Sequence, residues 1–484
     1  MKKLNFIIKC GLALLLLSFY SCESWLNVTP SDRLSEEMLF NDREGFVKAL
    51  NGVYIELNTN ELYGRNLTAG ALDVMGQYYN VASSSHAFYN YGGLVYTGNN
   101  EKTLFDNMWQ KCYAVIACCN TIIEKCDENK AGLSPVWKGS IKGEALALRA
   151  MLHFDMLRLF GPLTSELDKE SIPYQTNSDQ TVTPLLSGSE VIGLILDDLK
   201  NAVGLLKDTD PYFVEEEFSD TDLNYRRFRM NYFAAKGLMA RVQLWGGDKE
   251  KAAATAKEVI AEGQAEGAEF FPFVTNSEAT SSNPDRVFYS EVLFGTYHSS
   301  REKLHEDLFA PTLESTSILT LAGTARRDDL YDNENDYRYS VWSTYNKNGT
   351  SVLYHRKFEK QDNVTASRQY MIPLIRMSEM YLIAVECCKL DEASVYLNTF
   401  RNARNCNSLA LTEDNRINIL ANEYKKEMLG EGQLFFFYKR QEMVNIPDGN
   451  QATGTKNVEL TKYVVPLPES ETDQRISSTD ISNE

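Results

Sequence analysis

Residues suited to ligand chemistry gather in two stretches of the chain that lack helical periodicity. They are Asp73, Tyr78, Tyr79, Tyr89 and Tyr91 in the first stretch, and Trp342 and Tyr345 in the second. An aromatic ring offers a flat apolar face to the C–H groups of a sugar ring, while neighbouring carboxylates and amides bind hydroxyl groups. Both stretches therefore have the composition of a sugar-binding surface. Trp342 is the best single candidate, because tryptophan has the broadest apolar face and no helical pattern explains this one as core.

Each of these aromatic residues has an alternative role, in which the ring packs its own loop onto the rest of the protein. For any single residue this packing role is at least as well supported as ligand contact. Both stretches are poor in aliphatic residues, however, so we expect some rings of the set to be exposed.

Catalysis is not indicated by the sequence. No phosphate-binding loop, dinucleotide turn, GxSxG or HExxH motif occurs, and the histidines are scattered at positions 86, 153, 298, 305 and 355. Acidic neighbours such as Asp328 and Asp329 would have to flank a glycosidic bond at a defined separation, which sequence alone does not show. The run Glu215-Glu216-Glu217 is typical of a solvated face. We therefore expect a binding protein without a cofactor rather than an enzyme.

The cysteines do not predict a metal site. Cys10 and Cys22 lie at the N-terminal end, and the remaining seven of the nine cysteines include the adjacent pairs Cys118-Cys119 and Cys387-Cys388. An odd number cannot all pair internally, and no spacing suits a CxxC metal clamp. Buried free thiols are the favoured interpretation.

Helical periodicity fills most of the remaining chain. The stretch from Ile372 to Arg404 predicts two amphipathic helices, because apolar residues recur at three- and four-residue steps before and after Asp391. Asp391 is expected to accept the free N–H groups of the second helix, so that the two helices fold back as a hairpin. Other helices are predicted over Lys142 to Phe160, Glu190 to Leu206, Met230 to Trp245 and Lys249 to Ala261.

These helices predict a mostly α fold of stacked, tetratricopeptide-like helix pairs. The scaffold is expected mainly over 42–58, 105–260 and 374–440, and the loop-rich segments 59–104 and 263–370, with minor β structure, are expected to form the ligand face. No linker or low-complexity run divides residues 22–484, so we expect one composite domain. Arg149 and Asp155 lie in an apolar helix, either as a buried ion pair or on its wet side.

The N-terminus has the features of an export signal. A basic end and a short apolar run precede the tetrad Phe19-Tyr20-Ser21-Cys22, which resembles a lipoprotein cleavage box. We therefore predict a signal peptide over 1–21 and lipidation at Cys22, which would tether a water-soluble body to a membrane.

The charge of the chain excludes one class of partner. A formal net charge of −18 at pH 7 repels phosphate backbones, so nucleic acid is not expected to bind.

Several motifs, in order along the chain, resemble those of the SusD/RagB family of outer-membrane nutrient-binding lipoproteins. They include GEALALRAMLHFDMLRLFGPL, Lys357-Phe358, Arg376 with SEMYL, Leu397-Asn398 to Arg401 and Arg404, and Glu427 to Gln433 leading into Lys439-Arg440. The run Arg326-Arg327-Asp328-Asp329 departs from the order usual in the family. Each motif is modest, but their number and order make the resemblance specific.

The resemblance implies a non-catalytic, cell-surface glycan-binding lipoprotein of the outer membrane. Such a protein passes oligosaccharides to a SusC-like TonB-dependent transporter. Three alternatives remain open at this point: a family member that binds peptides, a surface glycoside hydrolase, and a helical scaffold that binds only proteins.

Overall fold

The computed structural model describes residues 36–179, 181–267, 269–473 and 475. The predicted signal peptide and Cys22 lie outside these residues. Helix accounts for 54% of the structure and strand for 8%, which confirms the mostly α prediction.

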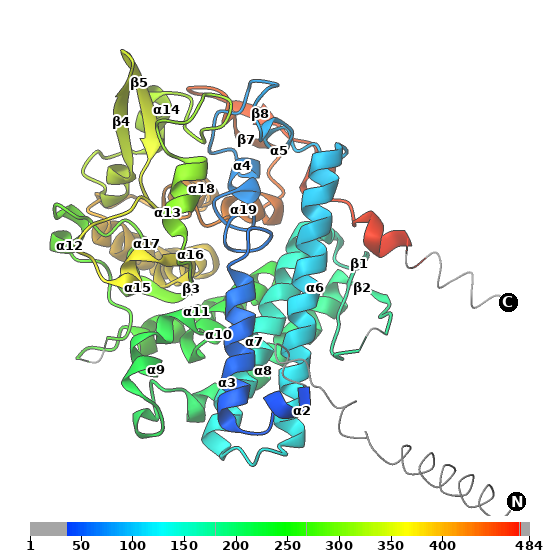
Figure 1. Ribbon diagram of the computed structural model, residues 1–484. Helices are drawn as coiled ribbons and strands as arrows, with labels where there is room; N and C mark the ends of the chain where they lie inside the picture. The colour runs from blue at the N-terminus through cyan, green and yellow to red at the C-terminus, as the bar shows by residue number, and fades with distance from the viewer. Residues whose placement is uncertain (1–35, 180, 268, 474, 476–484) are drawn as a thin grey trace, which may run out of the picture.

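The scaffold is a row of long helices, each packed against the next (Figure 1). In order of contact they are α6 (Asn99–Glu128), α7 (Pro135–Phe160), α8 (Gly188–Thr209), α10 (Tyr232–Trp245), α11 (Lys249–Gly263), α16 (Met377–Cys387) and α17 (Leu390–Ala403). A further helix, α3 (Arg43–Leu57), packs against α6 and α7. Short turns join several neighbours, so the chain folds back on itself as the predicted helix pairs require.

Local signals set the ends of these helices. The Ser134 side chain accepts a hydrogen bond from the N–H of Trp137 at the start of α7, and Gly161 follows its last residue. Ser187 and Glu190 form a capping box at the start of α8. Each of these side chains pairs a backbone group that has no partner inside the helix, which is why such residues occur at helix ends.

Close contact between α7 and α8 depends on a small residue. A Cβ atom on Gly143 would come within 2.8 Å of Leu206 Cγ, so any larger residue would push the helices apart. Nearby, Arg149 of α7 makes two 2.7 Å hydrogen bonds to Asp198 of α8. Asp155 also lies inside, where it accepts hydrogen bonds from Arg158 and from the Tyr63 hydroxyl. Arg149 and Asp155 are therefore both buried, but they do not form the ion pair considered for them, because each pairs with another residue.

The predicted hairpin of α16 and α17 is present, but its turn differs from the expectation. Lys389 is the residue before α17, and no side chain caps the helix. Asp391 instead lies within the first turn, so its predicted capping role is wrong. Leu397 is fully buried and Tyr381 nearly so, and the Tyr381 hydroxyl donates to Gln264 Oε1 at 2.8 Å.

The strands form four separate antiparallel pairs. They are β1 (Glu170–Pro173) with β2 (Leu185–Ser187), β3 (Val292–Tyr297) with β6 (Met371–Arg376), β4 (Trp342–Lys347) with β5 (Thr350–His355), and β7 (Asn445–Pro447) with β8 (Thr455–Asn457). Asn348 and Gly349 join β4 to β5, and both have positive φ angles, as the two-residue turn of a tight hairpin requires. This hairpin projects from the body of the protein in Figure 1.

Shorter helices lie in and around the loop-rich segments. Their bounds are α2 (Glu36–Leu39), α4 (Ala71–Met75), α5 (Tyr89–Gly92), α9 (Asp220–Asn224), α12 (Asn276–Thr280), α13 (Arg301–Leu308), α14 (Thr324–Leu330), α15 (Ala366–Gln369), α18 (Arg416–Glu427) and α19 (Leu434–Arg440). Figure 1 shows α4, α5, α14 and the β4–β5 and β7–β8 hairpins at one end of the molecule, and α2 and α9 at the other.

One large hydrophobic core runs through the scaffold and continues under the loops. Among the described helices, none is long and apolar enough to cross a membrane. The seven cysteines in the described part of the chain are free thiols. Cys118 is exposed and Cys387 half-buried, so the expected burial holds for the other five.

Candidate functional site

The end of the molecule with the two hairpins is built from four segments: residues 76–96, 310–322, 342–356 and 445–457. We call this surface the loop-rich face. Backbone groups join the first two segments, because the Asn80 N–H donates to Thr320 O at 2.8 Å and the Ala87 N–H to Thr316 O at 3.1 Å. The β4–β5 hairpin is joined through Lys347 Nζ, which donates to Leu313 O at 2.9 Å. Segments far apart in sequence therefore form one continuous surface.

Only part of the predicted site is accessible on this face. Tyr89 and Tyr345 are each 45% exposed. The other predicted site residues are buried, namely Asp73, Tyr78, Tyr79, Tyr91 and Trp342. The expectation that some rings of the set would be exposed is confirmed, whereas direct ligand contact by these five residues is not compatible with their burial.

Asp73 holds two parts of the chain together. Its carboxylate accepts hydrogen bonds from the N–H groups of Gly430 at 2.6 Å and Gly432 at 3.0 Å, and from the Tyr79 hydroxyl at 3.0 Å. Both glycines have positive φ angles, which allow their N–H groups to turn toward one carboxylate. Burial raises the pKa of Asp73 to about 7, although these hydrogen bonds oppose the shift. Asp73 thus has a structural role, and its assignment to the ligand site was wrong.

The buried tyrosines pack between elements rather than facing solvent. The Tyr79 ring lies 6.0 Å from Phe309, and the Tyr91 ring lies 5.8 Å from Phe88 and 6.2 Å from Phe105. Tyr78 points its hydroxyl at the backbone oxygen of Tyr424, 3.4 Å away. These rings fill the space between the loops and the scaffold.

Trp342 packs the base of the β4–β5 hairpin against the body of the protein. It is the first residue of β4 and pairs with His355 of β5, with their rings 5.2 Å apart. With only 5% of its surface exposed, it cannot offer its broad face to a ligand. The prediction of an exposed Trp342 platform was wrong, and the alternative, that it anchors its own loop, is the one found. The ring at the start of the hairpin turns inward, whereas Tyr345 near the tip remains accessible.

A groove of about 380 Å³ lies at the edge of the loop-rich face, where Tyr96, the last residue of the 76–96 segment, contributes to its lining. It runs between the start of α6 and the C-terminal residues Val465 to Glu469. Tyr96, Phe105 and Leu467 give it apolar walls, while Lys102 and Asp106 lie among its polar groups. Its size falls within the usual range for small-molecule sites, which runs from roughly 300 to 1,000 Å³. An apolar wall with charged groups around it can bind a sugar ring and its hydroxyls.

Sequence reasoning missed this groove. Phe105 and Lys102 lie in a helix whose pattern marks them as scaffold, and the groove wall at Pro466 and Pro468 comes from a segment more than 350 residues later. The only available signal was the Tyr96-Thr97 pair at the end of the loop-rich segment, which precedes α6.

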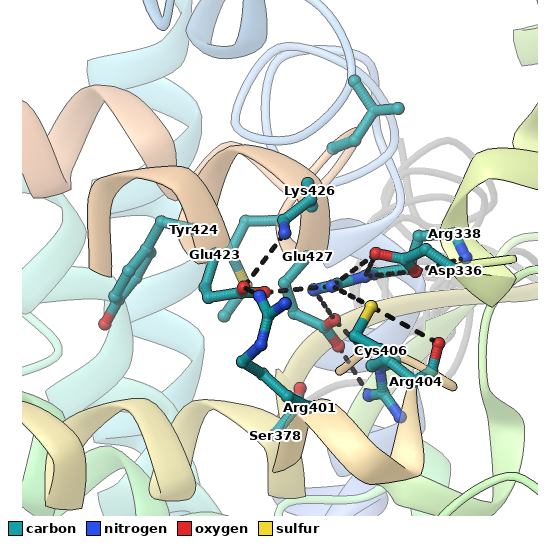
Figure 2. Close-up of polar contacts among 12 residues, drawn as sticks. Asp336, Arg338, Ser378, Arg401, Arg404, Cys406, Glu423, Tyr424, Lys426 and Glu427 are labelled. Atoms are coloured by element: carbon teal, nitrogen blue, oxygen red, sulfur yellow. Dashed lines mark hydrogen bonds and ion pairs between the residues drawn. The ribbon is translucent and has the colours of Figure 1, made fainter. Parts of the chain in front are cut away.

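The charged motif residues form a buried ion network instead of a ligand site (Figure 2). Glu427 of α18 accepts hydrogen bonds from Arg404 at 2.7 Å, from Arg338 at 3.1 Å, and from Arg376. Glu423, one turn earlier, pairs with Arg401, with Lys426 at 2.9 Å and with Arg338 at 2.9 Å. Burial alone would raise the pKa of Glu427, but Arg404 and Arg376 hold it well below its usual value.

The network is electrically balanced. Six basic side chains (Arg338, Lys357, Arg376, Arg401, Arg404 and Lys426) face six acidic ones (Glu291, Asp332, Asp336, Glu423, Glu427 and Glu431). They come from β6, from α17 and α18 and the turns that follow them, and from the loop-rich segment 263–370, so the network joins these two helices to that segment. Lys357, Arg376, Arg401, Arg404, Glu427 and Glu431 are all residues of the motifs noted in the sequence.

Family models match two large parts of the chain. A model described as starch-binding and associating with the outer membrane matches residues 24–244, and a model of the SusD family matches residues 327–476. SusD-like protein P2 of Formosa agariphila is 22% identical over an alignment of 526 residues that covers 96% of both proteins. A SusD-like protein of Bacteroides ovatus is 30% identical over 28% of this chain and 21% of its own.

Solved structures share the fold. A SusD-like carbohydrate binding protein from Bacteroides vulgatus matches with a TM-score of 0.69 and 21% identity, covering 89% of this chain and 96% of the other. A laminarin binding SusD-like protein matches with a TM-score of 0.63 and 16% identity, covering 89% and 97%. At such identities the similarity establishes the architecture, and the ligand of each relative remains its own.

Proposed function

Because the chain belongs to the SusD family, we propose that it captures glycan oligomers at the loop-rich face while a lipid on Cys22 tethers it to the outer membrane. From there it passes its ligand to a SusC-like TonB-dependent transporter. The family description supports outer-membrane association and starch binding, and similar structures are described as carbohydrate-binding proteins.

The observation that carries the proposal is the groove at the edge of the loop-rich face, together with the exposed Tyr89 on that face. The groove has the size and the mixture of apolar and polar groups that a sugar needs, and Tyr89 of α5 offers an accessible ring on the loop-rich face. Tyr345 extends the accessible aromatic surface along the same face, because both tyrosines flank the 310–322 segment. A chain of sugar units could contact several of these elements at once.

The proposed activity is binding without turnover. Asp328 accepts a hydrogen bond from Arg327 and Asp329 lies near Arg326, so the acidic pair considered for hydrolysis is engaged with its own helix. His153, buried inside α7, accepts a hydrogen bond from the Gln175 N–H at 2.9 Å and contacts the Arg149 carbonyl at 3.0 Å. These contacts favour structural roles for the candidate catalytic groups.

A glycan array followed by calorimetry tests the proposal. Removing a stacked ring should weaken binding of the best oligosaccharide by roughly 1 to 3 kcal/mol, by analogy with stacking of aromatic rings on bases. We therefore expect reduced affinity in Tyr89→Ala and Tyr345→Ala, with unchanged thermal unfolding. Tyr225→Ala is the matched control, because Tyr225 is also an exposed tyrosine but follows α9 at the opposite end.

Two results would contradict the proposal. Binding of peptides in preference to every oligosaccharide would favour the peptide-binding alternative, and release of shortened sugars from a bound oligosaccharide would favour a hydrolase. The transporter partnership has its own measurement, namely co-purification of the tagged protein with a TonB-dependent transporter from solubilised outer membranes.

A further inference from the structure

A second, narrower hollow on the ligand side of the molecule carries positive charge. It lies where the Gln77-Tyr78 turn meets α14 and α18, and Arg326 and Lys425 are among its lining residues. Both loop-rich segments contribute to it, since Gln77 comes from the first and Arg326 from the second. We call it the Arg326–Lys425 crevice.

The two cations of the crevice differ in their partners. Within the described residues, the Lys425 ammonium makes no hydrogen bond and no ion pair. The Arg326 side chain, in a residue only 7% exposed, makes no hydrogen bond either. It forms a loose ion pair with Asp329, 3.7 Å away on a side chain that is 54% exposed and also lines the crevice. Arg404, by contrast, is held by ion pairs to Glu291 and Glu427.

The lack of a partner has a cost. A buried cation loses its hydration and regains the energy only through an anion or hydrogen-bond acceptors. The effect is visible at Lys425, where burial, with Arg326 next in importance, lowers the pKa to about 8. Two cations that repel each other in one hollow would both be stabilised by a single incoming anion.

We propose that the Arg326–Lys425 crevice binds the carboxylate of an acidic sugar unit, so that glycans containing uronic acids are the ligand class of this protein. The inference rests on the proposed glycan-binding function and narrows it. Guanidinium and ammonium groups are the usual partners of carboxylates, and hydrogen bonds between charged groups are stronger than neutral ones.

The size of the crevice favours a carboxylate over a larger group. Its volume is about 20 Å³, whereas a single water requires roughly 10 to 15 Å³. That is room for one or two water-sized groups, so only the carboxylate enters, while the sugar ring remains outside against the loops. A sulfate ester, with three terminal oxygens, would need the walls to move. The crevice also gives an acidic protein, with a net charge of −18, a local site for an acidic ligand.

Protection of Lys425 from acetylation is a direct test. The rate of modification by acetic anhydride is measured at each lysine by mass spectrometry, with D-galacturonate, D-glucuronate, galactose or a sulfated galactose present at about 50 mM, above a millimolar Kd. We expect either uronate to slow acetylation of Lys425 by about fivefold or more, as occupancy at such a Kd requires. Galactose should leave the rate unchanged, and the exposed Lys303 should react equally in every sample.

Two methionine variants of α14 complete the test. Arg326→Met should abolish the protection, whereas Arg327→Met, which removes the same charge from the neighbouring residue, should retain it. Arg327 is the matched control because it pairs with Asp328 and lies over the Tyr339 ring, away from the crevice lining. Circular dichroism establishes that both variants are folded. Should Arg326→Met unfold, Arg326→Lys replaces it, with weaker but measurable protection expected.

The outcomes separate this inference from the proposed function. Equal protection by galactose, no protection by either uronate, or full protection in Arg326→Met would overturn the crevice assignment. Protection by the sulfated sugar alone would overturn the proposal that the crevice binds a carboxylate, and would assign the crevice to sulfate esters. If uronates protect Lys425 but no oligosaccharide binds on the array, the crevice is supported while the proposed function fails. If neutral oligosaccharides bind on the array but uronates do not protect Lys425, the proposed function is supported while the crevice assignment fails.

Discussion

Glu427 contacts three guanidinium groups in a region that excludes water, so each charge there depends on the others. The carboxylate lies between Arg338, Arg376 and Arg404, and all four side chains are buried. A buried ion network is costly to assemble, but removal of one member leaves its partners without compensation. The ion network therefore holds α17, α18 and β6 in one arrangement beneath the loops.

Substitution of Glu427 by glutamine tests this role. The change keeps the shape but removes the negative charge, so it should lower the free energy of unfolding by about 3 to 5 kcal/mol, the usual cost of breaking a buried pair. Urea unfolding followed by circular dichroism measures it. Glu166→Gln is the control, because Glu166 pairs with Lys169 on the surface, where a pair contributes at most about 1 kcal/mol. A loss below about 1 kcal/mol for Glu427→Gln would contradict the proposed dependence.

Asp73 makes stability depend on pH. Its folded pKa is about 7 and its ordinary value is 3.8, so folding favours the protonated carboxyl. The resulting stabilisation is complete below about pH 3.8 and is lost as the pH rises through about 7. Over that window the free energy of unfolding should fall by up to about 4 kcal/mol through this group, at about 1.4 kcal/mol per pH unit.

Comparison with Asp73→Asn isolates this contribution. The difference in the free energy of unfolding between the wild type and this variant should decrease steadily from about pH 4 to about pH 7 and then level off. The variant also places an amide NH₂ near the N–H groups of Gly430 and Gly432, which adds a loss that does not vary with pH. A difference that stays constant over the whole range would show that Asp73 remains ionised when buried. Asp414→Asn, an exposed aspartate, gives the background change.

At the level of elements, the helices could be predicted because each carries its own signal. Caps such as Ser187 and the three- and four-residue spacing of apolar residues are local, and α8, α10 and α11 were predicted within a few residues of their observed bounds. The motif charges were noted, but their function depends on partners from distant segments. Arg376, for example, meets Glu427 only after the chain has folded.

Exposure of the loop aromatics could not be predicted for the same reason. Tyr79 is covered by Phe309, and Trp342 faces His355 and the body of the protein, neither of which a local pattern reveals. The Asn348-Gly349 pair did contain a usable signal for the β4–β5 hairpin. Trp342 lies at the base of that hairpin and Tyr345 near its tip. They are three residues apart on β4, so their side chains point to opposite faces, and only Tyr345 remains accessible.

The two aromatic residues of β4 should therefore respond differently to alanine substitution. Trp342→Ala removes a buried ring and should cost about 3 to 5 kcal/mol of stability. Tyr345→Ala should leave the melting temperature unchanged and weaken only ligand binding. Differential scanning calorimetry and calorimetric titration with the same oligosaccharide measure both quantities. A wild-type melting temperature for Trp342→Ala would mean that the ring does not support the hairpin.

On the scale of the whole molecule, the loop-rich face and the start of the described chain lie at opposite ends (Figure 1). Helix α2, which begins at Glu36, is at the end remote from the two hairpins. Because the described chain begins at the end opposite the loop-rich face, we expect the proposed lipid on Cys22 to tether the protein without covering that face. Ligand capture and anchoring can then be changed independently.

The variant Cys22→Ala tests whether anchoring can be removed without loss of ligand capture. The variant lacks the proposed attachment point for the lipid, and the folded body is expected to be water-soluble, so it should appear in the soluble fraction after cell lysis and ultracentrifugation. Its affinity for oligosaccharide and its melting temperature should equal those of the wild type, because the anchor contributes nothing to the groove or the core. Cys10→Ala is the matched control: it removes a cysteine from the proposed leader and should leave the protein in the membrane fraction. If the folded Cys22→Ala protein sediments with membranes as the wild type does, the attachment depends on another part of the chain and the lipid anchor at Cys22 is excluded.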